Sequence, residues 1–360
     1  MQLEKVILSD FRNYIREEIS FSSGLNCIQG NNAEGKSNLL ESIYLISTGK
    51  SFRTTQLQQL IRHSQKKLQI EAHFSKEGIS HSLIISYGAD RRNLKYNQTS
   101  YSSFLPLLGI LPCILLTPED ISIITGGPAE RRRFLDLHLS QIDPLYIHHL
   151  GRYYKAMKQR NALLKKQEEK GLAPWEQIMA ISASYLIEKR IETLSFLKPS
   201  IENTISLLSE KQEIFSWQYE NSLSFLDPSQ ILKQWALHRK KELLLGTSLL
   251  GPHRDDIFLY IDNQEIKTYC SEGQKRSCTV ALRLAEWERF QISFGSPPLF
   301  GIDDFGVHLD HKRTFLLNQI LKKLGQVFLT APSFSLQENS HILQISKGFI
   351  TTSYPLKALV

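Results

Sequence analysis

The sequence predicts an α/β protein built around a phosphate-binding loop, with a helical insertion between two α/β segments. Three observations predict this class. A G-x-x-x-x-G-K-S stretch, Gly30 to Ser37, stands between a strand-like run and a helix-like run. Apolar residues recur at helical spacing from about Tyr146 onward, and a later apolar strand ends in Asp303 and Asp304. A strand, a phosphate loop, a helix and a strand-end carboxylate are the parts that a nucleotide-binding α/β fold requires.

The phosphate loop comes first along the chain. It consists of Gly30, Asn31, Asn32, Ala33, Glu34, Gly35, Lys36 and Ser37, and it follows the strand-like run Leu25 to Ile28. Glycines let successive backbone N–H groups point at one anion, and the helix that follows adds the positive end of its dipole. We expect Lys36 to reach the β- and γ-phosphates and the Ser37 hydroxyl to bind Mg²⁺. The alternative, an ordinary glycine turn, does not explain the flanking strand and helix.

Length and composition restrict the class further. With 360 residues, 41% of them hydrophobic, the chain is long enough for two lobes. Its most apolar run, Phe104 to Leu116, is short and contains two prolines, so no membrane span is expected. The charged N-terminus, Met1 to Val6, does not resemble a secretory signal, and the four cysteines form no C-x-x-C pair. We expect a cytoplasmic protein without disulfides, structural zinc or a membrane partner.

A helical insertion is predicted between the α/β segments. Residues spaced by three and four positions, all but one of them apolar or aromatic, run along one face of the first helix: Tyr146, Leu150, Tyr153, Met157, Asn161 and Leu164. A second helix is expected from Trp175 to about Leu197 and a third from Pro199 to Glu213. Two long helices joined by a Gly/Pro turn predict a short antiparallel arm without strands. The expected division is 1–125 and 246–360 for the two parts of the ATPase lobe, and 126–245 for the helical lobe.

The insertion carries an excess of positive charge. Between Pro128 and Lys170 there are ten Lys or Arg and five Asp or Glu, in a chain of net charge +7. This excess suits a DNA-facing surface, and an ordinary solvated helix face explains it equally well. The candidate DNA contacts are Arg131, Arg132, Arg133, Lys155, Lys158 and Arg160. For the three successive arginines, the alternative is a helix start at which they pair with nearby carboxylates.

The acidic strand supplies the second half of the site. Mg²⁺ that bridges β- and γ-phosphates takes oxygen ligands from the loop hydroxyl and from one strand-end Asp, for which Asp303 is the candidate. Asp304 can orient the attacking water or accept its proton. Lys36 and Asp303 lie 267 positions apart, more than a compact GTPase or kinase core requires. We therefore expect the helical insertion to be an integral part of the nucleotide-binding fold, which distinguishes this chain from a compact GTPase or kinase.

A second anion-binding helix start precedes the acidic strand. It reads Ser271-Glu272-Gly273-Gln274-Lys275, where free N–H groups and the helix dipole can bind phosphate. An ATP held between two subunits uses both sites, with the phosphate loop from one subunit and Ser271, Gly273 and Gln274 from the other. The alternative is a serine N-cap with an incidental glycine.

Over nearly its whole length the chain resembles the RecF family of bacterial recombination-mediator ATPases, relatives of SMC and ABC-type ATPase heads. Besides the motifs above, the resemblance rests on the blocks Asp10 to Tyr14, Lys50 to Arg53, Pro118 to Asp120, Gly127 to Asp136, Lys158 to Asn161 and Gly251 to Asp256. It implies an ABC/SMC-type head that uses ATP and Mg²⁺, forms an ATP-dependent homodimer and hydrolyses ATP weakly. It also implies binding of double-stranded and junction DNA, and a role with RecO and RecR in placing RecA on single-strand gaps in repair and replication restart.

The resemblance also implies roles for individual residues. Lys36 and Asp304 take the catalytic positions, Ser37 and Asp303 the metal positions, and Ser271 with Gly273 contacts the partner's γ-phosphate. Arg12 and Asn13 line the nucleotide from the N-terminal side. The block Gly251 to Asp256 either organises the nucleotide side or braces a loop.

Two departures from the family pattern predict slow hydrolysis. The chain has Val307-His308-Leu309-Asp310 where relatives usually have Ser-Glu-Leu-Asp, and His308 is either a base or a solvated loop residue. Thr330-Ala331-Pro332 leaves Thr330 as the candidate γ-phosphate sensor. Three rival functions remain: an ATP-binding DNA-structural protein with little turnover, an ABC-type ATPase subunit of a non-DNA complex such as a transporter, and a small-substrate kinase.

Overall fold

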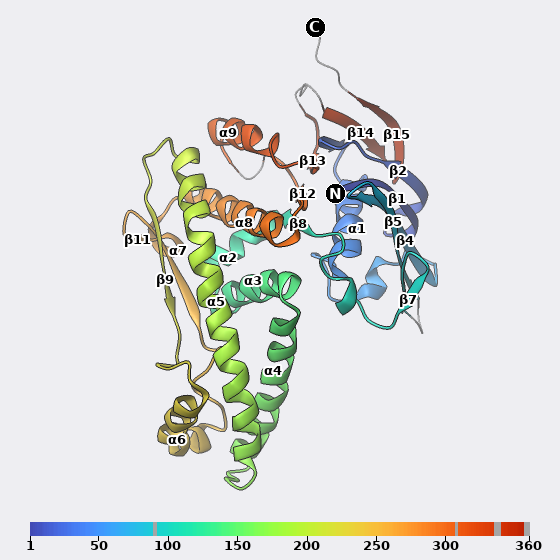
Figure 1. Ribbon diagram of the computed structural model, residues 1–360. Coiled ribbons are helices and arrows are strands. Elements are labelled where there is room, and N and C mark those ends of the chain that lie inside the picture. The colour runs from blue at the N-terminus through green and yellow to red at the C-terminus, as the bar shows by residue number, and fades with distance from the viewer. Residues whose placement is uncertain (89–91, 307–308, 335–339, 356–360) are drawn as a thin grey trace. The chain divides into compact units, whose positions relative to one another are not determined.

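The computed structural model describes residues 1–88, 92–306, 309–334 and 340–355, with the backbone alone for 352–355 (Figure 1). The chain forms two compact units. The first comprises Met1–Asp120 together with Arg283–Val360, and the second comprises Ile121–Leu282. The second unit is therefore inserted into the first along the chain. In the described ranges, no helix combines the length and the apolar composition that a membrane span needs.

Two six-stranded sheets make up most of the first unit. One is antiparallel, in the order β2-β1-β4-β5-β6-β7. Its strands are β1 (Gln2–Phe11), β2 (Tyr14–Ser20), β4 (Lys67–Lys76), β5 (Ile79–Gly88), β6 (Arg92–Tyr96) and β7 (Thr99–Tyr101). The other has the order β15-β14-β3-β13-β12-β8 and is parallel except for β15. Its strands are β3 (Leu25–Gln29), β8 (Cys113–Leu116), β12 (Leu299–Ile302), β13 (Val327–Ala331), β14 (Ser340–Ser346) and β15 (Phe349–Pro355).

Burial along the strands explains the two sheets. In β4, buried Leu68, Ile70, Ala72 and Phe74 alternate with more exposed residues, as in a sheet with one covered face. Strands β8, β12 and β13 are buried at every position, as in a parallel sheet covered on both faces. The unit also contains η1 (Leu57–Leu60), η2 (Leu105–Leu107), α9 (His311–Leu321) and the first three residues of η3 (Pro118–Ile121).

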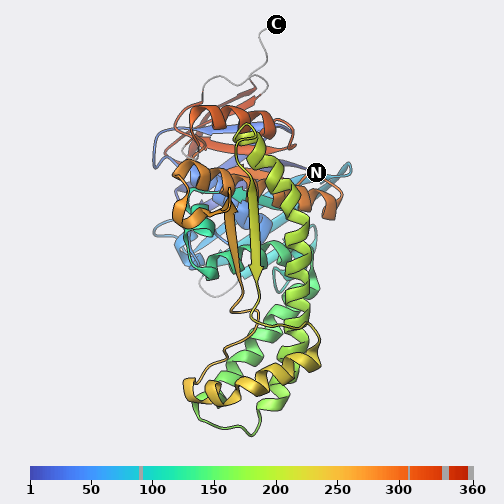
Figure 2. The ribbon, with the colours of Figure 1, turned by 90° about the vertical axis from the view of Figure 1, so that its left-hand side faces the viewer.

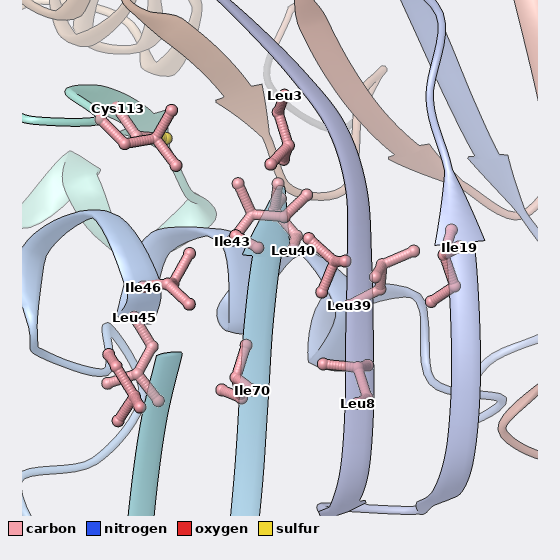
Figure 3. Packing of buried hydrophobic residues seen from close by; sticks show 14 of the residues in the cluster. Leu3, Leu8, Ile19, Leu39, Leu40, Ile43, Leu45, Ile46, Ile70 and Cys113 are labelled. Carbon is pink, nitrogen blue, oxygen red and sulfur yellow. The ribbon is translucent and has the colours of Figure 1, made fainter. Parts of the chain in front are cut away.

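Helix α1 (Lys36–Thr48) packs between the two sheets of this unit. It contacts β4 and β5 on one side and β8 and β13 on the other. Leu39 and Ile43 of α1 are fully buried in one cluster with Leu8 of β1 and Ile70 of β4 (Figure 3). Each such side chain contributes about 1.5–3 kcal/mol of burial free energy. This packing fixes the helix whose N-terminus follows the phosphate loop.

The second unit is mainly helical. Its helices are α2 (Ser122–Thr125), α3 (Pro128–Ile142), α4 (Pro144–Lys165), α5 (Leu172–Leu208), α6 (Pro228–Leu245), α7 (Ile266–Tyr269) and the first part of α8 (Glu272–Phe294). A small antiparallel sheet has the order β11-β10-β9, with β9 (Phe215–Glu220), β10 (Asp256–Ile261) and β11 (Gln264–Glu265). Helices α4 and α5 lie side by side, joined by residues 166–171, and α6 packs against both of them (Figures 1 and 2).

Two expectations for this unit are wrong. Helix α5 does not end near Leu197 but continues through Pro199 to Leu208. Leu197 and Ile201 are fully buried on either side of the proline, and this burial outweighs the roughly 3 kcal/mol that an interior proline costs. The lobe is also not strandless, because β9 pairs with β10. The expected boundary at residue 245 falls between these two paired strands.

Two of the expected DNA contacts are interior residues. The Arg160 side chain is 0% exposed, and it donates hydrogen bonds to Glu176, Glu242 and Ser248. Arg131 pairs through two nitrogens with both carboxylate oxygens of Asp256, at 2.7 and 2.8 Å. The expectation that Arg160 and Arg131 contact DNA is wrong, because carboxylates neutralise both charges inside the lobe.

Arg160→Ala is expected to lower the free energy of unfolding by about 3–5 kcal/mol, because it leaves the buried Glu242 carboxylate without its guanidinium partner. Urea unfolding measures this loss. The matched control is Lys158→Ala on the exposed face of the same helix, which should change the free energy by less than about 0.5 kcal/mol. Equal stability of the two variants would contradict the role of the buried ion network.

Candidate nucleotide-binding site

The topology of the parallel sheet explains how distant segments meet. Strands β3, β13 and β12 are neighbours and run in the same direction. Their carboxyl ends therefore lie at one edge of the sheet, where ligands of such sheets bind. The phosphate loop follows β3, Thr330 lies near the end of β13, and Asp303 follows β12. Sheet order, rather than sequence separation, brings the loop and Asp303 together.

The phosphate loop needs both of its glycines, Gly30 and Gly35. Gly30 has a φ of +155°, and a Cβ there would lie 2.4 Å from the backbone oxygen of Ile345. Gly35 has a φ of +121°, and a Cβ there would lie 2.8 Å from the Asn13 side chain. Any other residue would strain the backbone and displace a neighbour at these positions.

The loop backbone is held from outside by three groups. The Asn13 side-chain amide donates to the Glu34 carbonyl oxygen at 2.9 Å, and the Tyr14 hydroxyl donates to the Gly35 carbonyl oxygen at 2.9 Å. Burial raises the pKa of Tyr14, so its hydroxyl stays a donor. From the turn between β14 and β15, the Gly348 N–H donates to the Glu34 carbonyl oxygen, also at 2.9 Å. The Glu34 carboxylate accepts the N–H of Lys347 in the same turn.

Arg12 supports the helix behind the loop. Its guanidinium donates to both carboxylate oxygens of Glu41, at 2.8 and 2.9 Å, and Glu41 is fully buried on α1. Ser51 donates to the same carboxylate. Arg12 and Asn13 were expected to line the nucleotide, but the structure places their side chains against Glu41 and the loop backbone. They brace the site instead of lining it.

A pocket of about 390 Å³ opens over the loop. Its described lining residues are Asn32, Ala33, Gly35, Lys36, Ser37, Asn38, Arg53 and Asp304. Lys36 Nζ lies 2.8 Å from the carbonyl oxygens of Gly30 and Asn31, which holds the ammonium group over the loop. Lys36 and Arg53 are the two cations among these lining residues. Two positive charges at a helix N-terminus suit a polyphosphate.

Arg53 and Asn38 are site residues that the sequence reasoning did not assign. Arg53 Nη1 donates to the Asn38 side-chain oxygen at 2.7 Å, and Asn38 in turn donates to Asn13 at 2.7 Å. Asn38 directly follows the phosphate-loop motif, and Arg53 belongs to one of the blocks that carry the family resemblance. No spacing rule predicts that either side chain lines the pocket.

Ser37 and Asp303 form a candidate magnesium site. The Ser37 hydroxyl donates to Asp303 Oδ1 at 2.8 Å, and Asp303 is 6% exposed. Burial raises the pKa of Asp303 and the charge of Asp304 raises it further, while hydrogen bonds from Thr330 and Ser37 oppose the shift. A hydroxyl and a carboxylate are the few hard oxygen ligands that Mg²⁺ takes when phosphates and water complete its shell. The residues present therefore fit this ion.

Thr330 positions both acidic residues. Its hydroxyl donates to Asp303 Oδ1 at 2.7 Å and accepts the backbone N–H of Asp304 at 2.8 Å. Asp304 has a φ of +53°, a strained conformation that this hydrogen bond helps to hold. Thr330 was the candidate γ-phosphate sensor, but its single O–H group is already donated to Asp303. Val307 and His308 lie outside the described residues.

Asp303→Asn is expected to abolish Mg²⁺-dependent nucleotide binding while raising the melting temperature of the protein without nucleotide. Because folding raises the pKa of Asp303, its ionised form costs stability at neutral pH, and this cost disappears as the pH falls through the folded-state pKa. The difference in melting temperature between Asp303→Asn and wild type should therefore shrink as the pH is lowered. Calorimetry over a pH series measures this difference, and Glu119→Gln is the exposed control. A lower melting temperature for Asp303→Asn would contradict the prediction.

The second anion-binding motif lies in the inserted unit. Ser271 immediately precedes α8, and its exposed side chain accepts the Gln274 N–H at 3.3 Å. The Gln274 side-chain oxygen accepts the Ser271 N–H at 2.9 Å. This reciprocal arrangement is a capping box, so the N-cap interpretation describes what Ser271 does within its own chain. Gly273, two residues further on, is half-buried.

The remaining predicted residues of this unit divide into exposed and structural groups. Arg133, Lys155 and Lys158 are exposed, whereas Arg132 donates to the Asp255 carbonyl oxygen at 2.7 Å. Within the block Gly251 to Asp256, buried Asp255 pairs with Arg190 at 2.9 Å. His253 contacts the Tyr153 hydroxyl at 2.7 Å, and burial lowers the pKa of His253 to about 4. The block braces the inserted unit.

Comparison with known proteins identifies the family. The model of the RecF/RecN/SMC N terminal domain matches residues 2–347. The DNA replication and repair protein RecF of Protochlamydia amoebophila is 40% identical over 92% of this chain and 94% of its own length. The chain belongs to the RecF family. RecF of Chlamydia caviae is 35% identical over 98% of both chains.

Solved structures agree with the fold of this RecF-family chain. The recombination mediator protein RecF of the RecFOR pathway, solved as RecF-ATP, has a TM-score of 0.88 at 31% identity, over 99% of this chain and 97% of its own. An Smc head bound to the C-winged helix domain of ScpA has a TM-score of 0.60 at 16% identity, over 100% of this chain and 98% of its own, which shows likeness of fold alone. The predicted fold class, an ABC/SMC-type ATPase head, is confirmed.

Proposed function

We propose that this RecF-family chain binds ATP with Mg²⁺ and dimerises around it to hold DNA during repair and recombination. The observation that carries the proposal is that Lys36 and Ser37 line the pocket over the phosphate loop and that the Ser37 hydroxyl donates to the Asp303 carboxylate. The solved relative named RecF-ATP, at 31% identity, supports the choice of nucleotide.

The charged and hydroxyl side chains at the pocket have separate roles in this proposal. Lys36 and Arg53 neutralise phosphate charge, and Ser37 and Asp303 would hold Mg²⁺, which would supply further positive charge at the β- and γ-phosphates. Asp304 reaches the same pocket and orients the attacking water. Thr330 holds the Asp303 carboxylate and the Asp304 backbone in place. We expect weak ATPase activity, because Thr330 has no second O–H group to donate to a phosphate.

The inserted unit supplies the other half of a composite site. Ser271 is exposed at the start of α8, where the helix dipole favours an anion. In a homodimer, Ser271 and Gly273 of each copy would contact the γ-phosphate bound to the other copy. The Gln274 side-chain oxygen is used in the cap, so its amide NH₂ group is the part of Gln274 that can contact phosphate. ATP then stabilises the dimer because each nucleotide bridges two subunits.

Exposed basic residues of the inserted unit are the proposed DNA contacts. Lys155 and Lys158 on α4 and Arg133 on α3 have exposed side chains. Curated relatives are named DNA replication and repair protein RecF, and a solved relative is a recombination mediator of the RecFOR pathway. We infer that this chain binds double-stranded and junction DNA, and that it assists RecA loading at gaps together with RecO and RecR.

Replacing both Lys155 and Lys158 with alanine is expected to weaken DNA binding without changing sequence preference. Phosphate contacts release counterions, so the slope of log affinity against log salt should fall by about 2. Fluorescence anisotropy with plain and gapped duplexes, with and without ATP, measures the slope. The matched control replaces Lys240 and Lys241, which are exposed on α6 of the same unit. Wild-type affinity that does not change with salt or with ATP would contradict the proposal that an ATP-dependent dimer holds the DNA.

One observation also favours an ATP-binding DNA-structural protein with little turnover. The Thr330 hydroxyl is engaged by Asp303, which leaves the site without this sensor. A turnover assay of wild type and Lys36→Ala, with and without DNA, separates the two functions. DNA-stimulated phosphate release that depends on Lys36 supports the ATPase, whereas nucleotide binding without release supports the structural role.

A further inference from the structure

A second pocket lies in the inserted unit, formed by β10, β11 and the end of α7. Its volume is about 440 Å³. Its described lining residues are Phe258, Tyr260, Asn263, Gln264, Glu265 and Tyr269. None of these six residues was given a function by the sequence analysis, and none takes part in the proposed ATP or DNA contacts.

The strand pattern places the aromatic rings on an open face. Phe258 and Tyr260 alternate along β10 with the buried Ile257, Leu259 and Ile261, so both rings lie on the face opposite the core. Tyr269 ends α7 and is 70% exposed. Exposed aromatic residues at the wall of a pocket favour binding of a partner over packing of the core.

Polar groups complete the lining. The turn between β10 and β11 presents Asn263, whose φ of +62° is the left-handed conformation that hairpin turns require. Glu265 of β11 accepts a hydrogen bond from the Thr268 hydroxyl at 2.8 Å, which fixes its carboxylate beside the rings. Gln264 adds a second amide.

The charges of the lining determine which ligand it suits. The six residues include three aromatic rings and one carboxylate, and no Lys, Arg or His is among them. The faces of aromatic rings attract cations, and Glu265 adds a full negative charge. The same carboxylate repels a phosphate backbone, so the lining is unfavourable for nucleic acid.

We propose that this pocket binds an arginine side chain of a partner protein. A guanidinium group is planar, stacks on aromatic rings and carries five N–H donors, which match the Glu265 carboxylate and the amide oxygens of Asn263 and Gln264. A lysine ammonium lacks the flat face that stacks on Tyr260 or Tyr269. The proposal does not depend on the ATP site, because none of the six lining residues is among the proposed ATP contacts.

The test uses the full chain and a small probe, the peptide acetyl-Gly-Arg-Gly-amide, with saturation-transfer NMR as the measurement. A peptide with citrulline in place of arginine has nearly the same shape but no charge, and it should bind at least about fivefold more weakly. Glu265→Gln should weaken binding of the arginine peptide about fivefold, and Tyr269→Ala about three- to fivefold.

Two exposed residues of the same unit supply matched controls. Tyr154→Ala on α4 and Glu220→Gln on β9 repeat the same chemical changes outside the pocket and should leave the affinity for the arginine peptide unchanged. Thermal unfolding verifies that all variants are folded. Equal binding of the citrulline peptide, or unchanged binding by both pocket variants, would overturn the proposal. If oligo-dT displaces the peptide from wild type and Tyr269→Ala abolishes oligo-dT binding, the pocket is a base-stacking surface and the proposal is overturned. If a second copy of the chain displaces the peptide, the pocket is a self-association surface, which also overturns the proposal.

Discussion

Lys36→Ala is expected to reduce ATP binding by about a hundredfold or more and to abolish ATP hydrolysis. Lys36 is 5% exposed, and its ammonium group is held over the loop by the Gly30 and Asn31 carbonyl oxygens, so it meets a phosphate with little loss of side-chain entropy. Removing a preorganised, charged donor from such a pocket commonly costs a factor of about 10²–10³ in rate. Arg53, the other cation of the pocket, is exposed and tied to Asn38, so we do not expect it to substitute.

Nucleotide affinity is measured with a fluorescent ATP analogue, and hydrolysis by phosphate release. The control is Lys66→Ala, which removes an exposed lysine of the same unit and should leave both quantities unchanged. An affinity within about threefold of wild type would show that the loop does not bind the nucleotide through Lys36, and the proposed site would have to be abandoned.

Ser271→Arg is expected to block ATP-dependent dimerisation while nucleotide binding by each monomer stays nearly intact. Ser271 is exposed, so its own unit has room for the larger side chain. In the dimer, the arginine would fill the space that the partner's γ-phosphate has to enter. Loss of the cap to Gln274 should lower the free energy of unfolding by only about 1 kcal/mol, so the monomer remains folded.

Sedimentation velocity with and without ATP measures the dimer, and fluorescent ATP measures monomer binding. Gln218→Arg adds the same side chain to an exposed position on β9 of the same unit and should dimerise like wild type. An unchanged ATP-dependent dimer of Ser271→Arg would remove Ser271 from the composite site, but it would leave the phosphate loop assignment untouched.

The parts of the site that follow a local rule were predictable. A phosphate loop needs glycines with positive φ, a strand before it and a helix after it, and all of these lie within about twenty consecutive residues. The serine at the start of α8 follows a similarly local capping rule. Asp303 required one long-range assumption, that its strand lies near β3, and the order β3-β13-β12 agrees with that assumption.

The residues that were misjudged depend on distant partners. Arg160 and Lys158 look alike in a basic helix, yet one is fully buried against Glu176 and Glu242 and the other is exposed. The resemblance implied that Arg12 and Asn13 line the nucleotide, but their side chains bind the Glu41 carboxylate and the Glu34 carbonyl oxygen. Helical spacing alone does not reveal such partners.

By itself the sequence determined the class of the protein, the phosphate loop, the candidate metal ligands and the helical insertion, because each depends on the conformation of a short segment or on a motif with a defined mechanism. Only the tertiary structure decided which arginines are available to a ligand and that Thr330 positions Asp303 and Asp304. It also decided that α5 continues through Pro199 and that aromatic residues of β10 and α7 line a second pocket. Burial and ion pairing between distant segments determine these features, and the free energy of such contacts depends on which residues the fold brings together.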